Sequence, residues 1–114
     1  MHNILKELSL FLQIPEQDIR PAVNFPGYFV TAYGDIVSCL GRAPRCLKQA
    51  NMDQGNKTVL LRRNGRSDCV LVHNLILEAY AGAKPYGHRA YFKDGNRDNL
   101  TVENLEWRPR TAEA

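Results

Sequence analysis

The chain lacks the cysteine pattern, the apolar runs and the leader of a secreted or membrane protein. Its three cysteines include no C-x-x-C pair, which a zinc knuckle or a redox motif would need. Apolar runs such as 70–72 are far shorter than the roughly 20 residues of a membrane span. The first 13 residues contain charges and no small-residue cleavage site, unlike a signal peptide. We therefore expect a cytoplasmic protein without a membrane partner, whose thiols stay reduced: Cys39, Cys46 and Cys69.

A strong excess of charge of either sign is also absent, since the net charge is +3 over 114 residues. The charge is nevertheless unevenly distributed, because the segment 39–73 holds seven basic residues against two acidic ones. Such clustering suits a polyanionic partner, because each neutralised phosphate releases counterions. A solvated hairpin explains it nearly as well. The candidate nucleic-acid-binding residues are Arg42, Arg45, Lys48, Lys57, Arg62, Arg63 and Arg66.

An amphipathic helix is predicted at the N-terminus. Residues 3–13 place apolar side chains at helical spacing, with Asn3 as a candidate cap and Pro15 after the last apolar position. Residues 1–20 are assigned to this helix and a connector, which Pro21, Pro26 and Gly27 extend, and residues 21–114 to a single domain. The apolar helix face docks on that domain in the interpretation that we favour. In the alternative it joins a second copy of the chain as a homo-oligomer.

Strand-like and turn-like segments alternate through the rest of the chain. Strands are predicted at 28–31 and 36–38, and again at 58–61 and 68–72 around Asn64-Gly65, which supplies the positive φ angles of a two-residue turn. Residues 72–81 have apolar side chains at helical spacing and end near Gly82. A short extended piece at 89–92 precedes a turn at 94–96. Helix, antiparallel hairpins, helix and a small ββα-like end indicate the α+β class.

Collinear strings between residues 26 and 107 resemble the phage-type HNH homing endonucleases, a ββα-metal or His-Me finger family. Residues 28–38, YFVTAYGDIVS, are similar to the Y-x-V-S-x-x-G-x-I-x-S pattern of that family's N-terminal accessory module, here about 26–48. Residues 72–80, VHNLILEAY, resemble V-H-R-L-V-A-E-A-F. Residues 91–107 lie over D-H-I-D-G-N-x-x-N-N-x-x-E-N-L-x-W. The resemblance implies a nuclease-like core at about 55–110.

The positions that build the fold of this family are retained. An Asn of the second motif ties the motif loop to its strand in the family, and Asn104 matches it. His73 matches the family at the start of a helix, where we expect it to hydrogen-bond a loop. The other retained positions are Gly34, Asp94, Gly95, Asn96 and Trp107.

The positions that carry the family's chemistry differ. Active members hold a metal with an Asp, and the His that follows is the general base for the attacking water. Tyr91 and Phe92 stand at these positions; a protonated phenol is a poor ligand for a hard cation, and a phenyl ring accepts no proton. The ligand from the closing helix would fall near Glu113. His88 lies four positions before Phe92, roughly 13 Å along an extended strand, so we expect no metal, no cofactor and no cleavage.

Three functions remain open from the sequence. The favoured one is a catalytically inactive nuclease relative that binds the DNA phosphate backbone through its basic hairpins, although Asp35 and Asn74 replace residues that are often basic in the family. The first alternative is a virion component, or a binder of a phage or host protein, that uses the N-terminal helix and Tyr91-Phe92; packing of a vacated polar site explains these aromatics as well. The second is an active nuclease with His88 as a displaced base. The expected location is the cytoplasm, of the host cell for a phage gene, or else the virion.

Overall fold

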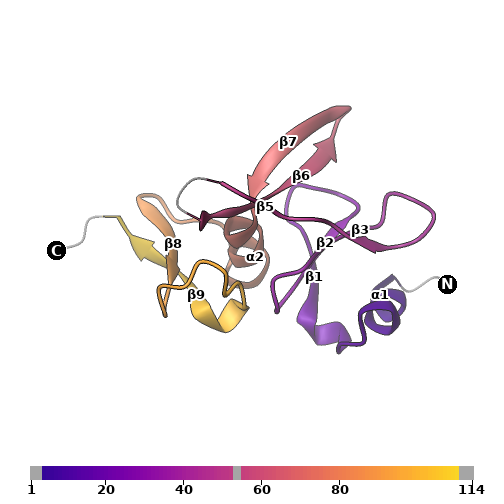
Figure 1. Ribbon diagram of the computed structural model, residues 1–114, viewed down its shortest axis with the longest axis horizontal. Helices are drawn as coiled ribbons and strands as arrows, with labels where there is room; N and C mark the ends of the chain where they lie inside the picture. The colour runs from indigo at the N-terminus through magenta and orange to yellow at the C-terminus, as the bar shows by residue number, and fades with distance from the viewer. Residues whose placement is uncertain (1–3, 53–54, 111–114) are drawn as a thin grey trace.

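Three small antiparallel sheets and two α-helices make up the part of the chain that the computed structural model describes, residues 4–52 and 55–110 (Figure 1). The sheets have the strand orders β1-β2-β3-β4, β5-β6-β7 and β8-β9. Two 3₁₀ helices, η1 (Glu16–Asp18) and η3 (Val102–Asn104), precede β1 and β9. The other elements are α1 (Ile4–Leu12), β1 (Ile19–Pro21), β2 (Tyr28–Thr31), β3 (Ile36–Ser38), β4 (Arg45–Cys46), β5 (Ala50–Asn51), β6 (Lys57–Arg63), β7 (Arg66–Leu71), α2 (Val72–Ala81), β8 (His88–Phe92) and β9 (Leu105–Pro109).

The first sheet carries the N-terminal helix. The predicted hairpin of β2 and β3 is confirmed, and α1 docks on this sheet through Leu8, which is fully buried in a cluster with Ile19 and Val37. Strand β1 occupies the segment where the sequence predicted a connector. Pro21 is tolerated there because β1 is an edge strand, where a missing N–H leaves no ladder bond unpaired. Asn3, the candidate cap, lies outside the described residues.

The β6–β7 hairpin has the turn that the sequence predicted. Asn64 and Gly65 adopt φ angles of 54° and 76°, and Arg63 pairs with Arg66 across the turn. The short strand β5, which the sequence did not indicate, pairs with the start of β6. The hairpin projects away from the rest of the molecule (Figure 1). Its tip is therefore open to a partner.

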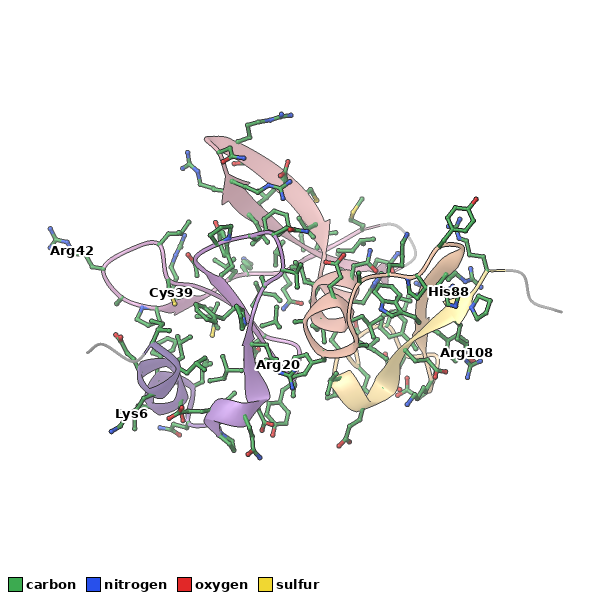
Figure 2. The ribbon with its side chains drawn as sticks, turned by 180° about the vertical axis from the view of Figure 1, so that it is seen from behind. Lys6, Arg20, Cys39, Arg42, His88 and Arg108 are labelled. Atoms are coloured by element: carbon green, nitrogen blue, oxygen red, sulfur yellow. The ribbon has the colours of Figure 1, made fainter. Side chains whose placement is uncertain are left out.

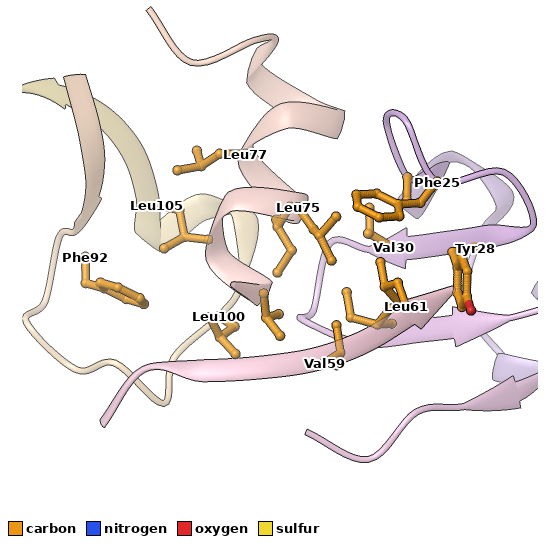
Figure 3. Packing of buried hydrophobic residues seen from close by; sticks show 14 residues of the cluster. Phe25, Tyr28, Val30, Val59, Leu61, Leu75, Leu77, Phe92, Leu100 and Leu105 are labelled. Atoms are coloured by element: carbon orange, nitrogen blue, oxygen red, sulfur yellow. The ribbon is translucent and has the colours of Figure 1, made fainter. Parts of the chain in front are cut away.

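Helix α2 has the predicted bounds and lies between the first sheet and the C-terminal strands (Figure 1). Leu75 and Ile76 are fully buried, and the core extends from Phe25 and Tyr28 on one side to Phe92 and neighbouring leucines on the other (Figure 3). Burying each such side chain contributes about 1.5–3 kcal/mol. The helix thus joins the predicted accessory module to the nuclease-like end.

Strands β8 and β9 form a two-stranded ribbon at the C-terminal end. Phe92 pairs with Leu105 at one end of the ribbon and His88 pairs with Pro109 at the other. The turn at Gly34 packs closely on this region, since a Cβ there would lie 2.8 Å from Leu100 Cβ. The closing helix of the expected ββα arrangement and Glu113 lie outside the described residues.

Candidate functional site

Asn104 ties the loop that follows β8 to the start of β9. Its Oδ1 accepts a hydrogen bond from Asp94 N at 3.0 Å, and its Nδ2 donates to Asp94 Oδ1 at 3.0 Å and to Asn99 O at 2.9 Å. Lys93 N also donates to Asn104 O at 2.8 Å. Asn104 is buried, and a buried amide with its bonds satisfied rigidifies its surroundings. This is the loop-to-strand tie that the resemblance implied.

Asp94 turns its carboxylate into the same loop. The hydrogen bond from Asn99 Nδ2 and that from Asn96 N hold the pKa of Asp94 below its usual value, with a further contribution from Asn104. Both carboxylate oxygens therefore accept bonds from the loop itself. Asp94 is a structural residue of the loop in this geometry.

Phe92 fills the position of the general base with part of the hydrophobic core. It is buried with Leu105 and Leu100 (Figure 3), and its ring meets that of His73 edge-on, with centroids 5.5 Å apart. His73 Nδ1 lies 2.9 Å from Asn74 Oδ1, its neighbour on α2, and the expected bond from His73 to a loop stays a prediction. Burial lowers the pKa of His73, and the charge of Arg97 lowers it further. The hydrogen bond to Asn74 raises this pKa, but by less than burial lowers it.

A cleft of about 480 Å³ opens beside Phe92 and Tyr91. Four cationic side chains line it, and none of its described lining residues is acidic. Aromatic, amide and aliphatic groups complete the wall. The cleft is lined by Asn56, Leu71, His73, Asn74, Lys84, Arg89, Ala90, Tyr91, Phe92, Gly95, Arg97 and Arg110.

Nearby acidic groups are engaged outside the cleft, which leaves its charge positive. Asp98 lies 3.3 Å from Lys57 Nζ, and Glu106 pairs with Arg108, whose guanidinium also stacks 3.6 Å from the Tyr91 ring centroid. Arg97 donates to the neutral Asn56 Oδ1 at 2.6 Å. Such an arrangement attracts an anion, because like charges held together are stabilised by a counter-charge.

The described residues of the cleft do not fit the divalent metal that the resemblance implies for active nucleases. Tyr91 offers a phenol under a guanidinium, Phe92 offers no donor, and the oxygens of Asp94 are committed to the loop. Across the described ranges 4–52 and 55–110 no three His, Cys, Asp or Glu side chains gather where a metal ion could bind. Four cations around the cleft add electrostatic repulsion.

His88 lies away from this cleft. It stands at the opposite end of β8 from Phe92, and its Nδ1 lies 3.0 Å from Tyr86 O. It lines a neighbouring hollow instead, together with Lys84, Tyr86 and Arg110. His88 and Phe92 thus line different hollows.

The basic residues predicted for nucleic-acid binding are dispersed over the molecule. Arg42 lies in the loop between β3 and β4 at one end of the molecule (Figure 2), whereas Arg62 and Arg66 lie in the β6–β7 hairpin. Arg63 is engaged within the protein: it donates to Asn24 O, stacks on Phe25 and lies 3.6 Å from Asp68. Lys57 is engaged with Asn51 and Asp98. The remaining five of the set are exposed: Arg42, Arg45, Lys48, Arg62 and Arg66.

Sequence reasoning missed the four cations of the cleft. They lie in the segment 84–110, where acidic residues in the same stretch mask them in any count by sequence. The fold separates the two signs, because the acidic side chains turn into their own loop or pair elsewhere. The available signal was their placement before, within and after the HNH-like string at 91–107. They are Lys84, Arg89, Arg97 and Arg110.

Comparisons with known proteins point to one family. Residues 70–114 match the family model described as HNH endonuclease. The chain is 27% identical over 103 residues to an uncharacterized HNH endonuclease of Acanthamoeba polyphaga mimivirus, covering 90% of this chain and 25% of that protein. A solved structure on DNA binding and cleavage by the HNH homing endonuclease I-HmuI has a TM-score of 0.73 at 24% identity, covering 81% of this chain and 52% of that one.

This chain thus spans about a quarter and about half of the length of these two relatives. None of the described helices is long and apolar enough to cross a membrane. The part of the chain that matches the family model, residues 70–114, includes α2, the Asn104 loop and the β8–β9 ribbon. Residues 70–114 are thus similar to HNH endonucleases, and the chain has the α+β fold of an HNH homing endonuclease.

Proposed function

We propose that this protein binds the phosphate backbone of DNA without cleaving it. The observation that carries the proposal is the cleft, which combines four cations with aromatic residues at the metal and general-base positions. Lysine and arginine contacts to phosphates supply affinity that does not depend on sequence. Hydrolysis by the family mechanism needs a metal and a proton acceptor instead.

One proton acceptor, His73, does line the cleft. Its side chain is only 8% exposed and its ring lies against Phe92. A base must reach the attacking water within about 2.6–3.2 Å, and this burial restricts that approach. His73 therefore supports the cleft wall in our proposal.

The exposed tip of the β6–β7 hairpin provides a second contact with the backbone. Arg62 and Arg66 are exposed there and lie outside the ion pairs of the described residues. Contacts at the hairpin and in the cleft would fix the orientation of DNA on the protein. Such a function places the protein in the cytoplasm of the cell that holds the DNA.

Two assays on the full chain test the proposal. A supercoiled plasmid incubated with the protein and Mg²⁺ or Mn²⁺ stays intact, at the level of a buffer control, while a gel shift with duplex DNA shows salt-sensitive binding. Metal-dependent nicking that His88→Ala or His73→Gln abolishes would contradict the absence of cleavage. Absence of a shift at micromolar protein and low salt would contradict DNA binding.

A protein-binding role is the second candidate, and it is favoured by one observation. Leu10 and Phe11 on α1 are 72% and 48% exposed, although the opposite face of the helix is docked. Exposed apolar side chains of this size on one helix suit a second copy of the chain or a phage or host protein. Size-exclusion chromatography of the wild type and of Leu10→Glu distinguishes a dimer, which the variant dissociates, from a monomer.

A further inference from the structure

We propose that the cleft and the adjoining loop of Pro85, Tyr86 and Gly87 form one site for single-stranded DNA, with a phosphate in the cleft and an unstacked base on the ring of Tyr86. The inference rests on the proposed function, because it assumes a nucleic-acid ligand. It adds the form of that ligand and the residue that selects it. We call these three residues the Tyr86 loop.

Tyr86 presents a complete aromatic side chain to solvent. Its relative exposure is 102%, the highest among the large apolar residues of the described chain. The loop that carries it is tied down on both sides, since His88 N donates to Pro85 O at 3.1 Å and Arg110 N donates to Gly87 O at 2.7 Å. Gly87 adopts the φ of 75° that this turn requires. Because the backbone of this loop is tied, stacking on Tyr86 costs mainly the rotamer freedom of one side chain.

The Tyr86 loop is continuous with the cationic cleft. The hollow beside Tyr86 is lined by the loop together with Lys84, His88 and Arg110. Lys84 and Arg110 also line the cleft, so the two hollows share two cations. When a phosphate of a DNA strand lies among these cations, a neighbouring base of that DNA strand therefore lies near the Tyr86 ring.

The charge of the ribbon also indicates an anionic ligand. Arg89 and Arg108 face each other directly across β8 and β9, and like charges at such a pair are destabilising. Glu106 and Tyr91 compensate Arg108. Glu78 is the acidic group that interacts with Lys84. Burial raises the pKa of Glu78, and the charge of Lys84 lowers it by a smaller amount. Arg89 and Arg110 lack such a partner among the described ion pairs.

The combination of a protruding ring and a phosphate site favours a single strand over a duplex. Base faces in a duplex are covered by their neighbours, and extruding one costs a few kcal/mol. A single strand offers its base faces freely, and aromatic side chains beside a positive groove are the usual means of binding it. Tyr86 therefore contributes to single-strand affinity and adds little on a closed duplex.

Fluorescence anisotropy on the full chain tests this inference with a labelled 12-residue oligo-dT and a hairpin-capped duplex. Oligo-dT is expected to bind more tightly. Tyr86→Ala weakens oligo-dT binding by about 5- to 150-fold, the range for loss of one stacked base, and changes duplex binding less than twofold. Tyr86→Phe retains the ring and the affinity. Tyr33→Ala, which removes another exposed tyrosine in the turn after β2, leaves oligo-dT binding unchanged.

The outcomes separate this inference from the proposed function. Equal or tighter binding of the duplex, with no effect of Tyr86→Ala on oligo-dT, would overturn the single-strand site and leave backbone binding in place. Failure of both oligonucleotides to bind would overturn the proposed function and this inference with it. An unchanged urea unfolding midpoint of Tyr86→Ala shows that any loss of binding is not a loss of folding.

Discussion

Replacement of Asn104 by alanine tests the loop on which the whole site is built. The substitution removes three side-chain hydrogen bonds, to Asp94 N, Asp94 Oδ1 and Asn99 O. Each such bond contributes a net of about 1 kcal/mol. Asn104→Ala should therefore lower the free energy of unfolding by about 3 kcal/mol. That is a large share of the total stability of a small domain, about 5–15 kcal/mol.

Urea unfolding followed by the fluorescence of Trp107, the single tryptophan, measures this loss. With an m-value of about 1.5 kcal/mol/M, the midpoint falls by about 2 M. Asn96→Ala is the matched control, because the Asn96 side chain makes one bond, from Asp98 N, in the same exposed loop; its cost should be below about 1 kcal/mol. A loss below about 1 kcal/mol for Asn104→Ala, equal to that of the control, would refute the structural role.

The other predictions concern strain, pH and charge. Gly34→Ala should cost roughly 1–3 kcal/mol more than Gly65→Ala in urea unfolding, because both have positive φ but only at Gly34 would the new Cβ meet another atom, Leu100 Cβ at 2.8 Å. Because the pKa of His73 is lowered in the folded protein, its contribution to stability is full above the unfolded value of 6.5 and declines as the pH falls below it; a His73→Gln variant should lose this decline between pH 7 and 5, and an unchanged decline would contradict it. Arg63→Ala should destabilise by about 1 kcal/mol through loss of the Phe25 and Asp68 contacts, whereas exposed Arg62→Ala should leave the unfolding midpoint unchanged.

The sequence predicted most of the elements because they depend on local signals. Asn64-Gly65 defined one hairpin and the helical spacing of 72–81 defined α2, both at the observed positions. Strand β1 was not predicted because proline is rare within a sheet except on edge strands. Whether a strand lies at the edge of a sheet depends on the tertiary fold. Strand β5 has two residues and no pattern of its own.

The sequence predicted which catalytic side chains are replaced in the site, but it did not predict the positive charge of the cleft. The family string placed Tyr91 and Phe92 at the chemical positions and Asn104 at the tie, and the observed bonds of Asn104 agree. The cationic character of the cleft was not visible, because Arg89 and Arg97 are separated in sequence by the acidic Asp94 and become neighbours only through the fold. The number of basic residues along the chain favoured the hairpins as the binding site instead. Two of those residues, Arg63 and Lys57, form ion pairs within the protein.

The salt dependence of duplex binding tests the central claim most directly, that the cleft binds phosphates. Dissociation constants between 50 and 200 mM salt are compared for the wild type and for Arg89→Ala/Arg110→Ala. Each phosphate neutralised contributes about 0.9 to the slope of log affinity against log salt, so the double variant should bind more weakly, with a slope shallower by about 2. An unchanged slope and affinity in the double variant would contradict phosphate binding in the cleft.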